Sequence, residues 1–119
     1  MFKLAVGIAL ISAVIATVDD SGRELHLAKS QVLKIRLPSN PTTGYSWSLA
    51  NRSSAVVKLQ GEPTYERKTG TDLAGSGGTE LWEFIAVQGG RQTLRFEYRR
   101  PWEKTVKPAK TVLFTILVR

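Results

Sequence analysis

The stretch that decides the fold is Thr93-Leu94-Arg95-Phe96-Glu97-Tyr98-Arg99. Every second residue in it is apolar or aromatic, and the residues between are polar or charged. A period of two is typical of a β-strand with one buried face and one face in water. The same period recurs in residues 31–37, 45–50 and 110–118, and no segment after residue 20 has a convincing helical period.

Glycine and proline punctuate the chain between these repeats, so the segments are short. Residues 81–87 are apolar on both faces apart from Glu83, and we expect a central strand there. The predicted strands cover residues 23–28, 31–37, 45–50, 55–60, 79–88, 91–99 and 110–118, with a weak further signal in 64–68. About seven short strands in roughly a hundred residues favour an all-β, immunoglobulin-like β-sandwich. Trp47, inside one of these strands, is expected in the core.

The composition argues against an enzyme. The 119 residues suffice for one domain, and they include no cysteine and one histidine, His26. A thiol nucleophile and a cysteine-ligated zinc are thereby excluded, and we predict no metal and no cofactor. A Ser–His–acid site would have to use His26, near which nothing marks a nucleophile. The formal net charge is +7, but the basic residues are spread along the chain, so nucleic acid is not the expected partner.

The first residues have the pattern of a secretory signal. A basic start, Met1-Phe2-Lys3, precedes an apolar run from Leu4 to Ala16 and the acidic pair Asp19-Asp20. We predict a signal peptide over residues 1–16, cleaved after Ala16, and a domain over 17–119 that is secreted or periplasmic. A retained anchor is the alternative, although the run is shorter than the roughly 20 residues of a spanning helix. Without the signal we expect a monomer with no stable membrane insertion.

Three loops are expected at one end of the sandwich. If each predicted strand crosses the sandwich once, the loops at residues 38–44, 61–78 and 100–109 emerge at the same end. An additional crossing by residues 64–68 would break this arrangement.

Each of these loops has an unusual composition. The first contains Asn40-Pro41-Thr42-Thr43-Gly44, in which Pro41 fixes the backbone and Gly44 permits a turn. This describes either a stiff wedge that loses little entropy on docking or an ordinary hairpin connection. The second contains Leu73-Ala74-Gly75-Ser76-Gly77-Gly78, either a flexible loop or exposed backbone that pairs with a partner. The third begins Arg100-Pro101-Trp102, either a binding hot spot, for which tryptophan beside arginine is typical, or a tryptophan folded back onto the sheet edge.

Together the three loops resemble the chagasin family, which inhibits papain-type cysteine peptidases. The motifs that carry the resemblance stand in the family's order: Asn40-Pro41-Thr42-Thr43-Gly44 with Tyr45, then Gly75-Ser76-Gly77-Gly78, then Arg100-Pro101-Trp102. The resemblance covers residues 17–119. One departure is a segment before the glycine motif that is a few residues longer than the family pattern, around Arg67 and Lys68.

The resemblance implies reversible, competitive inhibition of papain-like proteases of the papain and cathepsin type. The first loop would enter the catalytic cleft, with Thr42 nearest the catalytic residues. Residues 73–76 would pair by backbone with the non-primed side, and Arg100 and Trp102 would contact the primed side. The competing interpretation is a sandwich domain that binds glycan or nucleic acid, with Trp102, Tyr98 and the basic residues as its support.

Overall fold

The computed structural model describes residues 12–51, 56–67 and 77–119. This part of the chain contains nine strands and two single-turn 3₁₀ helices, η2 (Val18–Asp20) and η3 (Pro41–Thr43). The strands are β1 (Val14–Thr17), β2 (Glu24–Leu27), β3 (Val32–Ser39), β4 (Ser46–Leu49), β5 (Val57–Leu59), β6 (Thr64–Arg67), β7 (Gly78–Ala86), β8 (Gly90–Arg99) and β9 (Lys110–Val118). None of the helices in these ranges is long and apolar enough to span a membrane.

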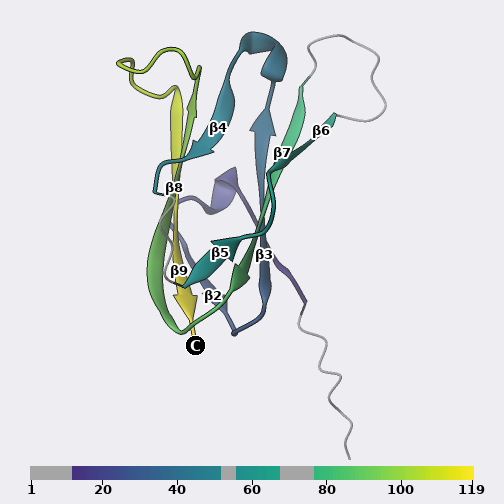
Figure 1. Cartoon of the computed structure of the whole chain (residues 1–119), viewed down its shortest axis with the longest axis vertical. Helices are drawn as coiled ribbons and strands as arrows, with labels where there is room; N and C mark the ends of the chain where they lie inside the picture. The colour runs from purple at the N-terminus through teal and green to yellow at the C-terminus, as the bar shows by residue number, and fades with distance from the viewer. Residues whose placement is uncertain (1–11, 52–55, 68–76) are drawn as a thin grey trace, which may run out of the picture.

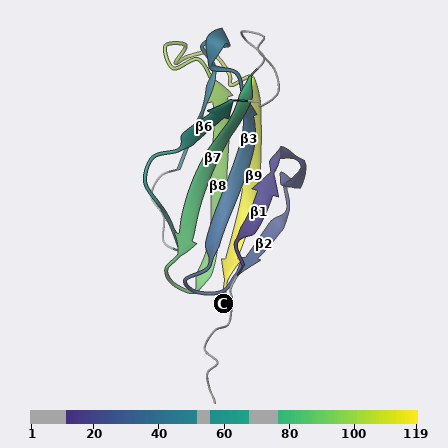
Figure 2. The ribbon, with the colours of Figure 1, turned by 90° about the vertical axis from the view of Figure 1, so that its right-hand side faces the viewer.

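The strands form two sheets that pack face to face, which confirms the predicted all-β sandwich (Figures 1 and 2). One sheet has the order β1-β3-β7-β5, with β6 also paired to β7, and the other has the order β2-β9-β8-β4. The β1–β3 and β2–β9 pairs are parallel, whereas the remaining pairs are antiparallel.

The core lies between β3 and β7 on one side and β8 and β9 on the other. The ring of Phe96 is at its centre and meets Trp82 and Phe114 edge-on, with centroids 5.1 and 6.1 Å apart. Edge-to-face contacts of this kind add to the burial of apolar area. Trp47 is buried as predicted.

The central strand β7 is fully buried on one face only, although residues 81–87 are apolar on both faces apart from Glu83. It lies between β3 and the β5–β6 edge, so its central position is confirmed. Only alternate residues face the core, however. Leu81 and Ile85 are half-buried on the outer face, and Val87 is 48% exposed beyond the end of the strand.

The segment from β5 to β6 crosses the sandwich only once. β5 pairs antiparallel with Phe84–Ala86, and β6 pairs antiparallel with Gly78–Leu81 of the same strand. The two pieces therefore run in one direction along β7, separated by Gly61 and Pro63 in a break of the ladder. Residues 64–67 do not add a crossing, so the described strand ends that flank the three predicted loops lie at one end of the sandwich, as predicted.

β1 is a strand that the sequence analysis did not predict. It pairs with the first half of β3, in the register Val14 with Leu33 through Thr17 with Arg36, and Ala16 is fully buried. Cleavage after Ala16, the expected end of a signal peptide, would cut this strand between its third and fourth residues.

Candidate functional site

The strand ends place the loops together at one end of the molecule. Ser39 at the end of β3 is paired with Gly78 at the start of β7. Tyr98, near the end of β8, is paired with Lys110 at the start of β9. We call this end the loop pole and define it as residues 40–45, 77 and 100–109; it is at the top of Figure 1.

The first loop is a single turn of 3₁₀ helix that its own side chains hold. The Asn40 side-chain oxygen accepts hydrogen bonds from the Thr42 amide (3.3 Å) and the Thr42 hydroxyl (2.6 Å). The Thr43 hydroxyl donates to the Asn40 carbonyl over 2.6 Å. Pro41 occupies the first turn of the helix, where its missing N–H removes no helical bond. The two threonine hydroxyls thus stiffen the turn, while residues 41–43 stay exposed.

Gly44 ends the turn and makes room for Trp102. Its φ of 83° lies in the left-handed region, which glycine adopts without strain, and its N–H donates to the Pro41 carbonyl over 2.9 Å. A Cβ added at Gly44 would lie 2.6 Å from Cη2 of Trp102. The indole therefore packs directly on Gly44. The rest of the ring is open to solvent, so Trp102 is 67% exposed.

Arg100 fastens the third loop to the first. Its Nε donates to the Thr43 carbonyl over 3.2 Å, and its guanidinium lies 4.6 Å from the centre of the Tyr45 ring. An ion pair also joins Arg100 to Glu103 at 3.5 Å. Within the molecule itself, Arg100 and Trp102 of the third loop thus contact Thr43 and Gly44 of the first.

Tyr98 supports the turn from below. Its ring stacks on Tyr45 and is tilted against Trp47, with centroid distances of 5.3 and 4.8 Å. Its hydroxyl accepts a hydrogen bond from the Asn40 amide over 3.0 Å. Because Tyr98 is 9% exposed, it is a structural support and not the exposed aromatic that a glycan or nucleic-acid site needs.

The predicted second loop is shorter than residues 61–78, because Thr64–Arg67 form β6. Of that range, only residues 61–67, 77 and 78 are among the described residues. Leu73, Ala74, Gly75 and Ser76 lie outside them. Gly77 has a φ of 82°, and a Cβ there would be 3.1 Å from the Ser39 carbonyl oxygen. A Cβ at Gly78 would meet the Glu66 carbonyl oxygen at 2.0 Å. These two glycines bring the start of β7 against the base of the first loop and against β6.

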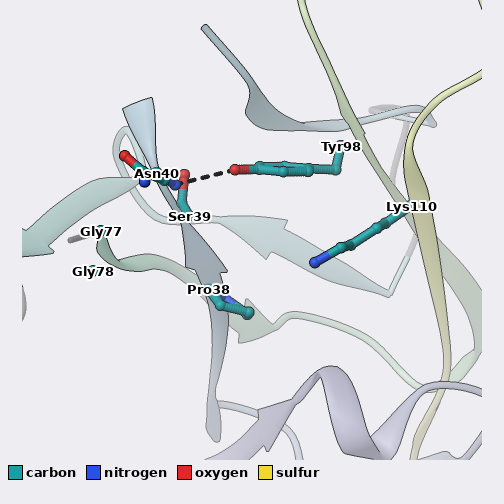
Figure 3. Close-up of a pocket in the computed structure, with 7 residues that line it drawn as sticks. All are labelled: Pro38, Ser39, Asn40, Gly77, Gly78, Tyr98 and Lys110. Carbon is teal, nitrogen blue, oxygen red and sulfur yellow. Dashed lines mark hydrogen bonds between the residues drawn. The ribbon is translucent and has the colours of Figure 1, made fainter. Parts of the chain in front are cut away.

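A cavity of about 250 Å³ lies at the base of the loops (Figure 3). Lys110 points into it from β9 under the Tyr98 ring, whose centre is 5.6 Å from Nζ. Its remaining lining comes from Pro38, Ser39, Asn40, Gly77 and Gly78.

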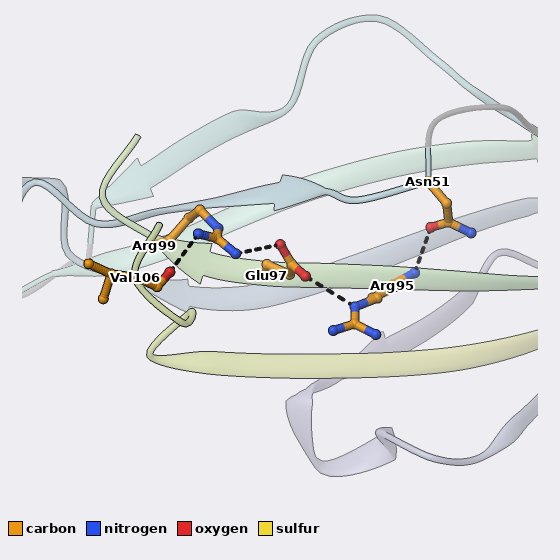
Figure 4. Close-up of polar contacts among 5 residues, drawn as sticks. All are labelled: Asn51, Arg95, Glu97, Arg99 and Val106. Carbon is orange, nitrogen blue, oxygen red and sulfur yellow. Dashed lines mark hydrogen bonds and ion pairs between the residues drawn. The ribbon is translucent and has the colours of Figure 1, made fainter. Parts of the chain in front are cut away.

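A charged ladder holds the third loop to β8 (Figure 4). Glu97 accepts from Arg99 at 3.0 Å and from Arg95 at 3.1 Å, and Arg99 also donates to the Val106 carbonyl over 2.9 Å. The hydrogen bonds from Arg99 and then Arg95 outweigh partial desolvation and lower the pKa of Glu97 below its ordinary value.

His26 lies far from this pole. It faces outward from β2, paired with Leu117 near the end of β9, and its side chain is 58% exposed with Glu24 at 3.7 Å. The sequence analysis missed two strand residues that support the loop pole from below, Tyr98 as a hydroxyl acceptor and the buried Glu80. Both could have been recognised from the alternation of their strands, because each occupies a position on the same face as the buried apolar residues.

Comparisons with known proteins agree on one family. Residues 26–116 match the sequence model of the chagasin family of peptidase inhibitors. Chagasin of Trypanosoma cruzi is 32% identical over 89 residues, which cover 69% of this chain and 76% of that protein. The crystal structure of the cysteine protease inhibitor EhICP2 from Entamoeba histolytica has a TM-score of 0.78 at 23% identity, covering 91% of this chain and 96% of that chain. The structure of PbICP-C in complex with falcipain-2 has a TM-score of 0.58 at 19% identity, covering 92% and 93%.

Proposed function

Because this chain belongs to the chagasin family of peptidase inhibitors, we propose that its loop pole closes the active-site cleft of a papain-like cysteine protease. The chain is a cysteine protease inhibitor and not an enzyme. The proposed protease-binding residues are Asn40, Pro41, Thr42, Thr43 and Gly44 in the cleft, Leu73 to Gly78 on one flank, and Arg100, Pro101 and Trp102 on the other.

The observation that carries this proposal is the internal bonding of the Asn40–Gly44 turn. Thr42 and Thr43 present little bulk, so the turn suits a narrow cleft. The turn is ordered before it meets a partner, which reduces the entropy lost on binding.

The same bonding explains why the loop would block a protease without being cut. The Asn40 carbonyl accepts from the Thr43 amide at 3.0 Å and from the Thr43 hydroxyl, and the Pro41 carbonyl accepts from Gly44. Hydrolysis would require one of these carbonyls to leave its partners and the turn to unwind into an extended strand. We therefore expect reversible, competitive inhibition.

Steady-state assays against papain and a cathepsin test the proposal. The expected result is an inhibition constant in the nanomolar range, a typical affinity for an interface of standard size (K about 1 nM corresponds to about −12 kcal/mol). Substrate should relieve the inhibition, and mass spectrometry should recover the inhibitor intact. No slowing of either enzyme at micromolar inhibitor would sink the proposal for those targets, and cleavage between Asn40 and Gly44 would sink the proposed mode.

We also propose that the N-terminal segment directs export, so that the inhibitor acts in a secreted or periplasmic location. The support is the basic start and the apolar run of residues 4–16. N-terminal sequencing of protein recovered outside the cytoplasm should find Thr17 as the first residue. A first residue at or before Val14 would contradict cleavage after Ala16 and leave β1 whole, and confinement to the cytoplasm would contradict export.

A further inference from the structure

Glu80 is a buried acid close beneath the loop pole. It is the third residue of β7, faces inward in step with Trp82 and Phe84, and is 8% exposed. Ser39 is the other buried polar residue of the described chain, and the two are hydrogen-bonded.

Three donors from three strands converge on the carboxyl group of Glu80. The Ser39 hydroxyl donates to Oε2 over 2.8 Å, and the Trp47 amide donates to the same oxygen over 3.2 Å. The indole N–H of Trp82 donates to Oε1, also over 3.2 Å. Both oxygens are therefore used, and within the described residues no Lys, Arg or His lies within 4 Å of them.

The positions of these donors relate Glu80 to the first loop. Ser39 is the last residue of β3, before the Asn40–Gly44 turn, and Trp47 is the second residue of β4, after it. β3 and β4 belong to different sheets, so the turn joins the two layers of the sandwich. One oxygen of Glu80 thus holds both stems of the loop, and the Trp47 indole adds a bond to the Pro38 carbonyl over 2.9 Å.

Burying a carboxyl group without a cationic partner lowers the stability of the fold, because the group loses its hydration. A fully satisfied polar network has a different advantage, because it accepts one arrangement of its partners and rejects others. An apolar side chain at position 80 would fill space but would leave the Trp47 amide and the Trp82 indole without acceptors.

We propose that Glu80 is a positioning residue for inhibition: it sets the separation of the two stems and thereby the angle at which the Asn40–Gly44 turn enters the protease. This rests on the proposed function of the turn. Glu80 itself is buried and would not touch the target.

The test compares Glu80→Gln, Glu80→Ala and Ser39→Ala with Ile116→Val. Ile116 is fully buried in β9 and paired with Gln92, away from the loop pole, so its variant loses stability without touching the stems. Glu80→Gln keeps the size of the side chain but replaces one acceptor oxygen with a donor, so at least one of the three donors loses its acceptor. We expect its inhibition constant to rise about ten-fold, the effect of one buried hydrogen bond left unmade. Most of that rise should come from faster dissociation.

Coupling between the two partners gives a sharper result. Once Glu80 is alanine, removing the Ser39 hydroxyl should cost nothing more, so the two effects on the inhibition constant should not add. Ile116→Val should lower the melting temperature but leave the inhibition constant unchanged. Glu80 variants that fold and inhibit like the wild type, or that lose inhibition only in step with their melting temperature, would overturn the proposal.

A second measurement needs no protease. The amides of Thr43 and Gly44 are bonded within the turn, so their hydrogen exchange reports its order. Exchange at both should speed up in Glu80→Gln and Ser39→Ala but not in Ile116→Val, and the Trp82 emission should shift in Glu80→Gln. Unchanged exchange in a folded Glu80→Gln would refute the positioning role even if no target protease were found. Faster exchange in a protein that inhibits nothing would instead refute the proposed function alone.

Discussion

Trp102 is the largest exposed apolar side chain of the loop pole, and it rests on Gly44 by one edge of its indole. An aromatic ring that is held at one edge and free on the other has lost part of its entropy before any partner arrives. Trp102→Ala should therefore weaken inhibition by about 2 kcal/mol or more, the scale of an interface hot spot. Steady-state inhibition constants measure this.

Leu113→Ala is the matched control for Trp102. Leu113 is also an exposed apolar side chain, at 40%, but it points outward from the middle of β9. Its removal should leave the inhibition constant unchanged, and neither variant should move the melting temperature by more than a few degrees. Equal inhibition by Trp102→Ala and wild type would remove the third loop from the interface.

At the scale of elements, β1 covers the outer edge of β3. It supplies the buried Ala16 and leads into η2, where Thr17 and Asp20 cap each other's backbone. A chain that starts at Thr17 should be less stable than one that starts at Ser12 by on the order of 1–2 kcal/mol, or about 5 °C in melting temperature per kcal/mol. Calorimetry of the two chains measures this difference.

The shorter chain should still inhibit. β1 pairs with residues 33–36 of β3 and does not reach the loop pole. The shorter chain should, however, have an unpaired edge on β3, and such an edge favours association between molecules at high concentration. Two chains with equal melting temperatures would show that β1 adds nothing to stability.

The ladder of Arg95, Glu97 and Arg99 makes the attachment of the third loop sensitive to acid. The pKa of Glu97 is lower in the folded protein than its ordinary value of 4.5. A lowered pKa means stability that is present above the unfolded value and is lost as the pH falls through the folded value. Urea unfolding between pH 7 and pH 3, at about one-unit steps, should therefore show a smaller acid-induced loss for Glu97→Gln than for wild type.

Asp20 is the control for that experiment. Its pKa is also lowered, first by the backbone hydrogen bond from Thr17 and also by Arg23, neither of which belongs to the third loop. Asp20→Asn should reduce the acid sensitivity of stability without changing inhibition at low pH, whereas Glu97→Gln should change both. Identical pH profiles for Glu97→Gln and wild type would contradict the predicted role of Glu97.

At the scale of the whole molecule, the alternation of the strands predicted the sandwich, its central strand and the meeting of the first and third loops. It could not separate β1 from a signal, because a buried strand and the apolar part of a signal peptide have the same composition. The parity of Glu80 indicates a buried side chain, but the sequence could not identify its donors, since two of them come from residues 33 and 41 positions away and the third is a ring nitrogen. The alternation of residues along a strand identifies its buried face, whereas a hydrogen-bond network of this kind depends on how the two sheets pack together.

The formal net charge of +7 belongs to no single loop and should act on encounter with the target. Long-range attraction speeds association and is screened by salt, but it has little effect on dissociation. With an acidic protease, the association rate constant should fall as salt rises from about 0.05 to about 0.5 M, while the dissociation rate constant stays nearly constant. Lys29 and Lys58 are exposed and distant from the loop pole, so reversing both to glutamate should lower association at low salt alone. Stopped-flow traces with the same association rate constant at both salt concentrations would contradict this prediction, because salt screens any long-range electrostatic attraction.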